Sequence, residues 1–290
     1  KIVMRLLDKQ NFIIAKDKLG FSEANLNKFD AMLKNPHGII LVTGPTGSGK
    51  STTVYAMLSE LNDSTKNIIT VEDPVEYTMA GINQVQVNPK AGLTFSAGLR
   101  SILRQDPDIV MIGEIRDQET VEIAIRAAIT GHLVLSTIHT NDAPSTISRL
   151  VDMGIPPYML AASLVGIMAQ RLVKKVCSFC KAQYTPSRFE LSAAGLPSTY
   201  NKPIYYGKGC SYCNNTGYKG RMAVHEMLVV DREVRDMISR GETVDAIRDY
   251  AVRHQNMSSL AQECIALMEK GETTIQEVIN TAYSYKGEGE

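Results

Sequence analysis

The sequence has no tryptophan, no net charge and no long hydrophobic run. Its 31 Lys and Arg residues balance 31 Asp and Glu residues, whereas a dedicated nucleic-acid-binding protein usually carries a basic excess. The longest nearly uninterrupted apolar stretch, Met159 to Ala169, falls well short of the roughly 20 residues that a membrane-spanning helix needs. The composition therefore argues against a nucleic-acid binder and against a transmembrane protein.

Cysteine is also scarce, and no secretory signal sequence is visible. The chain has five cysteines, and an odd number in a chain of this size indicates a reducing compartment, the cytoplasm. The chain opens with Lys1-Ile2-Val3-Met4, which is not a natural start, so we expect a fragment of a longer protein.

Short apolar runs alternate with helical patterns along the first two thirds of the chain. The runs predict strands at 39–42, 67–71, 108–112 and 133–136. Helical patterns at 22–34 and 119–130 carry apolar residues on one face. Buried strands that alternate with helices predict an α/β fold with a parallel sheet flanked by helices.

A glycine-rich segment directly follows the first predicted core strand and opens a helix. Gly44–Ser51 reads G-x-x-x-x-G-K-S, the P-loop pattern, in the strand–loop–helix context that it requires. Backbone N–H groups and the helix N-terminus would bind phosphates, Lys50 would reach the β- and γ-phosphates, and the Ser51 hydroxyl would bind Mg²⁺. The predicted nucleotide-binding residues of this segment are Gly44, Pro45, Thr46, Gly47, Ser48, Gly49, Lys50, Ser51 and Thr52.

The nucleotide is predicted to be ATP. Asn27-Lys28-Phe29-Asp30 matches the guanine-reading pattern N-K-x-D. The match precedes the P-loop and lies within an amphipathic helix, where Phe29 belongs to the apolar face. We therefore interpret it as a coincidence.

Carboxylates follow two of the predicted strands, where a P-loop enzyme needs them. Glu72 and Glu76 come just after one strand, and Glu114 follows the next. The latter strand is like a Walker B strand, except that Gly113 stands where an Asp normally binds the metal. Glu114 is the predicted base or water-orienting residue, whereas Asp117 fits a helix cap.

Two histidines and several arginines are further candidates. His132 and His139 bracket the strand at 133–136, and either could sense the γ-phosphate or be a structural histidine. Arg100 and Arg104 lie on one face of a predicted helix, where they could stabilise phosphate charge across a subunit interface or form an exposed basic surface. Arg116 and Arg5 are also candidates for completing the site.

Four cysteines form two tight pairs in a loop-rich segment. Cys177, Cys180, Cys210 and Cys213 give C-x₂-C twice. Two such pairs supply four thiolates for a tetrahedral Zn²⁺, which leaves no open position and predicts a structural site. A redox function is the weaker alternative, because neither pair opens a helix after a strand. Cys264 lies in a helical pattern and is predicted to be a core residue.

The motifs together resemble the type II/IV secretion ATPase superfamily. In that family they would be the Walker A motif, the Asp box, a Walker B motif with glycine and the His box. The matching strings are Gly44–Ser51, Val71–Glu76, Gly113–Asp117 and Thr130–Asp142. The paired cysteines resemble the branch that contains type IV pilus assembly (extension) ATPases and type II secretion ATPases.

The resemblance implies a RecA-like motor that hydrolyses ATP as a homo-hexamer. It implies a cytoplasmic protein, peripheral to the inner membrane, that acts on a membrane platform protein to add pilin subunits, with type II secretion as the alternative. More distant alternatives are a RecA-like nucleic-acid motor with a zinc ribbon and an ATP-binding module without turnover. Neither is favoured, because aromatic and basic residues do not interleave as in a stacking platform and Glu114 is present.

The expected organisation has five parts. Residues 1–18 would end a truncated N-terminal domain and its linker, and the RecA-like core would span 19–175. The tetracysteine region would span 176–222. Helical patterns at 231–240, 244–254 and 258–283, the last broken at Gly271, would form a C-terminal region at 223–285, and 286–290 would be a disordered tail.

Overall fold

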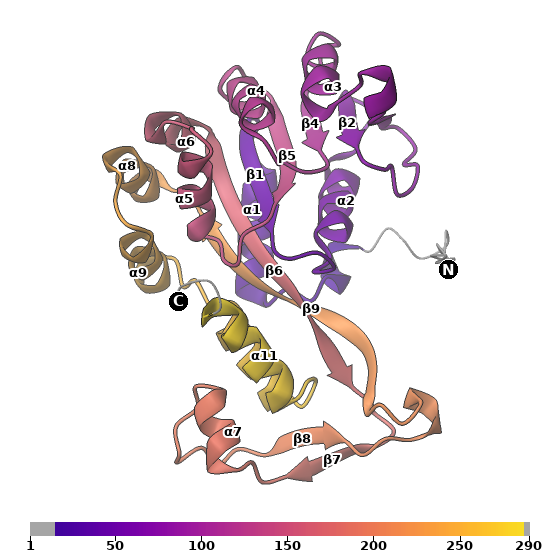
Figure 1. The fold of residues 1–290 in the computed structure, drawn as a ribbon, viewed down its shortest axis with the longest axis vertical. Helices are drawn as coiled ribbons and strands as arrows, with labels where there is room; N and C mark the ends of the chain where they lie inside the picture. The colour runs from indigo at the N-terminus through magenta and orange to yellow at the C-terminus, as the bar shows by residue number, and fades with distance from the viewer. Residues whose placement is uncertain (1–14, 287–290) are drawn as a thin grey trace.

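A seven-stranded sheet forms the centre of the molecule (Figure 1). The computed structural model describes residues 15–286, and the strand order is β3-β2-β4-β5-β1-β6-β9. Neighbouring strands are parallel except β6 and β9. The strands are β1 (Gly38–Thr43), β2 (Ile68–Glu72), β3 (Asn83–Gln86), β4 (Ile109–Ile112), β5 (Leu133–Ile138), β6 (Leu164–Val176) and β9 (Tyr218–Val229). The predicted α/β class is confirmed.

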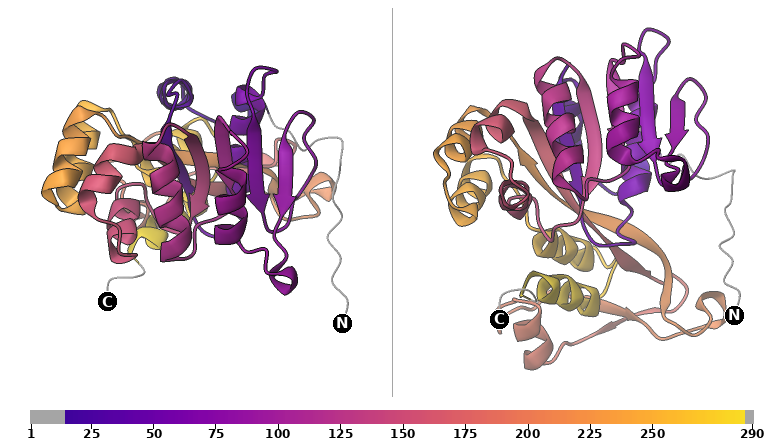
Figure 2. Two further views of the ribbon diagram at one scale, coloured as in Figure 1. Left: turned by 90° about the horizontal axis from the view of Figure 1, so that it is seen from above. Right: turned by 45° about the horizontal axis from the view of Figure 1, so that its top comes forward.

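Helices cover both faces of this sheet (Figure 2). Phe29 and Met32 of α1 and Met57 of α2 pack on one face, and Leu99 of α3 and Ile125 of α4 pack on the other. Because both faces are covered, β1, β2, β4 and β5 are buried throughout, which explains the apolar runs that predicted them. The helices of the core are α1 (Glu23–Leu33), α2 (Lys50–Leu61), α3 (Phe95–Ile102), α4 (Gln118–Ile129), α5 (Ser145–Asp152) and α6 (Pro157–Ser163).

Side-chain caps fix where several helices begin. The Ser22 hydroxyl accepts a hydrogen bond at the start of α1, and Asp117 and Thr243 do the same for α4 and α9 (Val244–His254). Each satisfies a backbone N–H that the helix itself leaves unpaired. The predicted cap at Asp117 is confirmed, and Ser259 caps α10 (Leu260–Glu269) in the same way.

The longest strands, β6 and β9, were not predicted. The apolar stretch that ends at Ala169 is divided between α6 and β6, and no local signal marks that boundary. The two strands pair antiparallel from Gly166 with Val229 to Val176 with Tyr218, and they extend below the sheet as a ribbon (Figure 1). One edge strand of the central sheet, β9, therefore comes from the part of the sequence that follows the cysteine pairs.

The ribbon leads to a smaller substructure and then to the C-terminal helices. The cysteine-rich segment contains β7 (Lys181–Tyr184), α7 (Arg188–Ala193), β8 (Ile204–Gly207) and the short helix η3 (Ser211–Cys213). After β9 come α8 (Arg232–Arg240), α9, α10 and α11 (Ile275–Lys286). The predicted break at Gly271 is confirmed, and Cys264 is buried within α10 as expected.

Several predictions concern residues outside this description. Arg5, most of the expected domain end and linker at 1–18, and the tail at 287–290 lie outside residues 15–286. Within the described part of the chain, none of the helices has the length and apolar character required to cross a bilayer.

Candidate functional site

The predicted phosphate loop connects β1 to α2 and curves around the start of the helix. Gly44, Gly47 and Gly49 all have positive φ values, +144°, +80° and +89°, which glycine adopts without strain. A Cβ at Gly47 would meet no atom within 4 Å, and Thr46 beside it is exposed. The loop is therefore open on the side where the α2 N-terminus can receive an anion.

Lys50 lies at the first position of α2 and curls over this loop. Its Nζ donates to the carbonyl oxygens of Gly44 at 2.8 Å and Pro45 at 3.1 Å. Burial lowers the pKa of Lys50, and the negative charge of Glu114 opposes that shift. Ser51, the next residue, is exposed. The Lys50 ammonium is thus held against the loop, and Ser51 beside it faces solvent.

Glu114 meets two of the other predicted residues. Its carboxylate forms an ion pair with Arg116, and its Oε2 lies 3.5 Å from Nε2 of His139. The hydrogen bond and charge of Glu114 raise the pKa of Arg116. Only 16% of the Glu114 side chain is exposed, so the carboxylate is shielded yet reachable. Such a carboxylate can accept a proton from, or orient, a bound water.

The strand order explains why these residues converge. β4, β5 and β1 are adjacent and parallel, so the loops after all three leave the same edge of the sheet. The Thr137 hydroxyl donates to the carbonyl oxygen of Gly113 at 2.7 Å. The hydroxyls of Thr43 and Thr140 lie 2.6 Å apart. These bonds fix the end of each strand to its neighbour. They thereby also fix the segments that follow the strands and carry Lys50, Glu114 and His139.

Glu72 is buried in a network of its own. Its carboxylate accepts hydrogen bonds from the hydroxyls of Tyr55, on α2, and Thr70, the latter at 2.5 Å, and from the Gln84 amide at 3.1 Å. Burial, together with the bond to Glu72, raises the pKa of Tyr55. The hydrogen bonds described for Glu72 include none to the phosphate loop. Glu76 lies half-buried in the loop after β2.

His132 lies away from the phosphate loop, which favours the structural alternative for this histidine. It precedes β5, and Leu133 pairs with Gly38 at the start of β1. The phosphate loop and His139 follow the other ends of these two strands. The His132 Nδ1 instead lies 2.9 Å from the carbonyl oxygen of Ala127. Because β1 and β5 are parallel, the two histidines that bracket β5 lie at opposite edges of the sheet, and of these two it is His139 that lies beside Glu114.

The prediction that Arg100 and Arg104 lie on one face of a helix is wrong. α3 ends at Ile102, so Arg100 lies in the helix and Arg104 lies in the turn after it. Arg100 is exposed and pairs with Glu119 of α4 at 2.7 Å. Arg104 is exposed as well. Neither contacts the phosphate loop in the described interactions.

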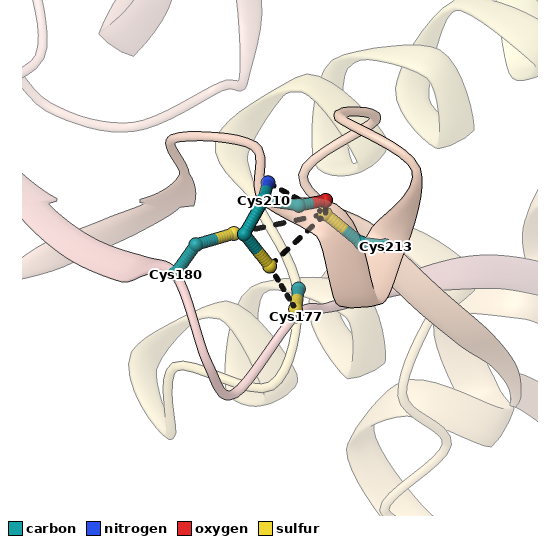
Figure 3. A group of neighbouring side chains, drawn as sticks. All are labelled: Cys177, Cys180, Cys210 and Cys213. Atoms are coloured by element: carbon teal, nitrogen blue, oxygen red, sulfur yellow. Dashed lines mark hydrogen bonds between the residues drawn. The ribbon is translucent and has the colours of Figure 1, made fainter.

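The four paired cysteines converge on one point between the two ribbons (Figure 3). Their sulfur atoms all lie within 4.8 Å of one another, and three of the pairs are 3.7 to 3.9 Å apart. A tetrahedral zinc ion with Zn–S bonds of about 2.3 Å holds its sulfurs about 3.8 Å apart. All four are free thiols. The geometry therefore fits a metal centre rather than two disulfides.

Backbone amides stabilise the charged form of this cluster. Cys213 Sγ accepts from the N–H groups of Cys210 at 3.2 Å and Gly217 at 3.3 Å. Desolvation opposes ionisation of Cys213, but these bonds and the neighbouring thiols lower its pKa to about 6. A Cβ at Gly207 would overlap the carbonyl of Gly217. The two cysteine turns, Cys177–Cys180 and Cys210–Cys213, are the knuckles of the cluster. Gly207 and Gly217 flank the second knuckle, and the lack of a side chain at both lets its two ends lie in contact.

Residues that the sequence analysis missed hold the loop after β5. The Ala143 N–H donates to the buried carboxylate of Glu226, on β9, at 2.9 Å. Asp142 pairs with Arg248, on α9, at 3.3 Å. These partners are more than 80 positions away in the chain, so no motif or spacing could have indicated them. Long-range packing thereby connects the His139 loop to the C-terminal region.

Known proteins are similar to this chain in sequence and in fold. A family model described as type II/IV secretion system protein matches residues 1–280. Type II secretion system protein E of Aeromonas hydrophila is 48% identical over 279 residues, which are 96% of this chain and 55% of the relative. Type IV pilus assembly ATPase PilB of Myxococcus xanthus is 49% identical over 286 residues, 97% of this chain and 50% of the relative.

A solved structure supports the same placement. The pilus retraction motor PilT with bound ADP superposes with a TM-score of 0.70 and 31% sequence identity, over 96% of this chain and 68% of that chain. The present chain spans about half the length of the curated relatives it matches. Sequence, motifs and fold agree, and the chain belongs to the type II/IV secretion system protein family.

Proposed function

We propose that this chain binds and hydrolyses ATP at the edge of the sheet where β1, β4 and β5 end. The observation that carries the proposal is the parallel order of β4, β5 and β1, because it brings the segments that carry Glu114, His139 and Lys50 to one edge of the sheet. The loop amides and Lys50 would hold the phosphates, and Glu114 would orient the attacking water. His139, beside Glu114, would respond to the γ-phosphate.

The Ser51 hydroxyl and nearby carboxylates are the donors available for Mg²⁺. When bound, Mg²⁺ would supply neutralisation of the negative charge that develops on the phosphates during hydrolysis. We propose Glu76 and Glu72 as acids that act on the metal or its waters. Glu72 already accepts three hydrogen bonds, one of them from Tyr55, so it would act through its remaining acceptor capacity or after a local rearrangement of α2 and β2.

We also propose that the four cysteines hold a structural Zn²⁺. The spacing of the sulfurs and the amide donors around Cys213 support it. Four protein ligands leave no position for water or substrate, so the ion would stabilise the fold rather than take part in chemistry.

The cellular process we propose is type IV pilus assembly, with type II secretion as the alternative. The names and nearly equal identities of the relatives support both. The motor would be a homo-hexamer at the cytoplasmic face of the inner membrane, where it would act on a membrane platform protein. Arg100, Arg104 and Arg116 would then be available to a neighbouring subunit's nucleotide, since all three are exposed.

The experiment is Mg²⁺-dependent ATP hydrolysis over a range of protein concentrations, with Glu114→Gln beside the wild type. We expect activity to rise more steeply than concentration, because the complete site would need a neighbour. Glu114→Gln should bind ATP normally and lose about 10²- to 10⁴-fold in turnover, the usual contribution of a general base.

The matched control is Glu122→Gln, which removes an exposed carboxylate of α4 that pairs with Arg126. It should hydrolyse ATP like the wild type. Full turnover by Glu114→Gln would exclude the assigned role. A wild-type chain that does not bind ATP would refute the proposed function itself.

A further inference from the structure

The phosphate loop rests on one buried side chain of the neighbouring strand. Gln170 of β6 is 2% exposed. Its Nε2 donates to the carbonyl oxygen of Ser48 at 2.8 Å, and its Oε1 accepts from the Thr53 hydroxyl at 2.6 Å. The amide thus connects the loop to the first turns of α2, and both of its polar ends are satisfied.

Two glycines of the loop lie in close contact with Gln170. A Cβ at Gly49 would lie 2.7 Å from the Gln170 Nε2, and a Cβ at Gly44 would overlap the Gln170 backbone oxygen. The loop therefore packs directly on Gln170, and two of its glycines are needed for that contact as well as for their positive φ values.

The hydrogen bond to Ser48 has a directional consequence. In a planar trans peptide the C=O and the following N–H point in opposite directions. Gln170 holds the Ser48 carbonyl toward the protein interior, so the Gly49 N–H is turned outward, to the side on which an anion would bind. A donor fixed in advance binds charge without the cost of reorganisation.

We propose that Gln170 is a positioning residue that pre-orients the phosphate loop for the nucleotide. The inference rests on the proposed function, because it deepens the account of the same site. Without the amide, the Ser48 carbonyl would lose its buried donor, and the 48–49 peptide could rotate away from the phosphate-binding orientation. The effect would fall on phosphate affinity in addition to stability.

The test compares ATP and ADP affinities, measured by calorimetry, with apo-protein stability for Gln170→Met and Gln255→Met. Gln255 is a matched control, because its amide also bridges backbone and side-chain groups, at Val229 and Asp231, in the C-terminal region. Both variants should lower the melting temperature. Only Gln170→Met should weaken ATP and ADP binding, by about tenfold, the value of one hydrogen bond.

A second variant keeps the test decisive if Gln170→Met does not fold. Gln170→Glu retains an acceptor for Thr53 and nearly the same shape but cannot donate to Ser48 when ionised, and it should also lose affinity. Normal nucleotide binding by a folded Gln170 variant, or equal loss in Gln255→Met, would overturn the inference. A wild-type chain that fails to bind ATP would instead refute the proposed function.

Discussion

The edge of the sheet that carries the phosphate loop and the tetracysteine cluster are stabilised in different ways. At the phosphate-loop edge, the loops follow β1, β4 and β5, which are buried along their whole length. The cysteines lie at the ends of ribbons, of which β7 and β8 form a two-stranded sheet with mostly half-exposed or exposed residues. Such a pair of strands is marginally stable alone. One site is preorganised by the core, and the other depends on its own ligands.

The largest expected effect comes from removing the proposed metal ligands. In Cys177→Ser/Cys210→Ser, loss of the proposed structural ion would remove a binding free energy on the order of 10 kcal/mol. Amides of the two knuckles should exchange with solvent on the order of 100-fold faster, while those of β1 and the phosphate loop stay protected. Metal content and hydrogen exchange by mass spectrometry would measure both.

The control for that experiment is Cys264→Ser, a buried thiol of α10 outside the cluster, which should keep its metal. Leu191 and Ile204 are buried in the main core cluster, so α7 and β8 should open less than the knuckles. If the amides of the knuckles exchange no faster in the metal-free double variant, the cysteine cluster does not depend on its ligands for stability.

A smaller effect is expected from glycine substitutions that crowd each site. Gly44→Ala places a methyl group against the Gln170 backbone at a positive φ, so overpacking and strain should destabilise the core by about 2–4 kcal/mol. Gly47→Ala also introduces a side chain at a positive φ, but into open space, and should lower the free energy of unfolding by about 1 kcal/mol. Urea unfolding of the apo-protein would distinguish them.

Gly207→Ala is the corresponding change in the other region, since its methyl group would overlap Gly217. We expect weaker metal retention with little change in the main unfolding transition. Equal destabilisation of the core by Gly207→Ala and Gly44→Ala would mean that the two regions unfold as one unit.

Acid should affect the central sheet through His225 on β9. Complete burial lowers its pKa to about 3, against 6.5 normally, so the folded protein keeps it neutral while the unfolded chain binds a proton. Stability is therefore complete above pH 6.5 and falls as the pH drops toward 3, by up to about 1.4 kcal/mol per pH unit.

His225→Gln should flatten this dependence. The measurement is the urea midpoint from pH 8 to 4 for both proteins, and the difference between the two curves isolates the histidine from acid loss of metal. Identical slopes would contradict the assignment.

The smallest effects concern helix caps in the two regions. Asp117→Ala removes the cap of α4, and Ser187→Ala removes the capping box of α7. Each substitution should lower the stability of its helix by about 1 kcal/mol. The first should lower the global melting temperature, and the second should appear only as faster exchange within α7. A global shift from Ser187→Ala would show that the smaller substructure is more tightly coupled to the core than we infer.

Local patterns predicted the buried part of the core well. The apolar runs at 39–42 and 108–112 became β1 and β4 because strands covered on both faces must be apolar. The same logic missed β6 and β9, whose lower halves leave the sheet and carry exposed residues. Glu114 and His139 could be predicted as neighbours from strand ends, but Arg104 could not be placed, because one turn at the end of α3 decided its direction.

The sequence by itself determined the phosphate loop and the cysteine knuckles, because each is a contiguous string whose backbone demands are met locally by glycine, a helix start and fixed ligand spacing. Only the tertiary structure decided that His139 joins Glu114 while His132 does not. It also decided that Gln170 lies beneath the loop. These outcomes depend on strand order and direction, which arise from long-range packing of the whole sheet rather than from any neighbouring residues.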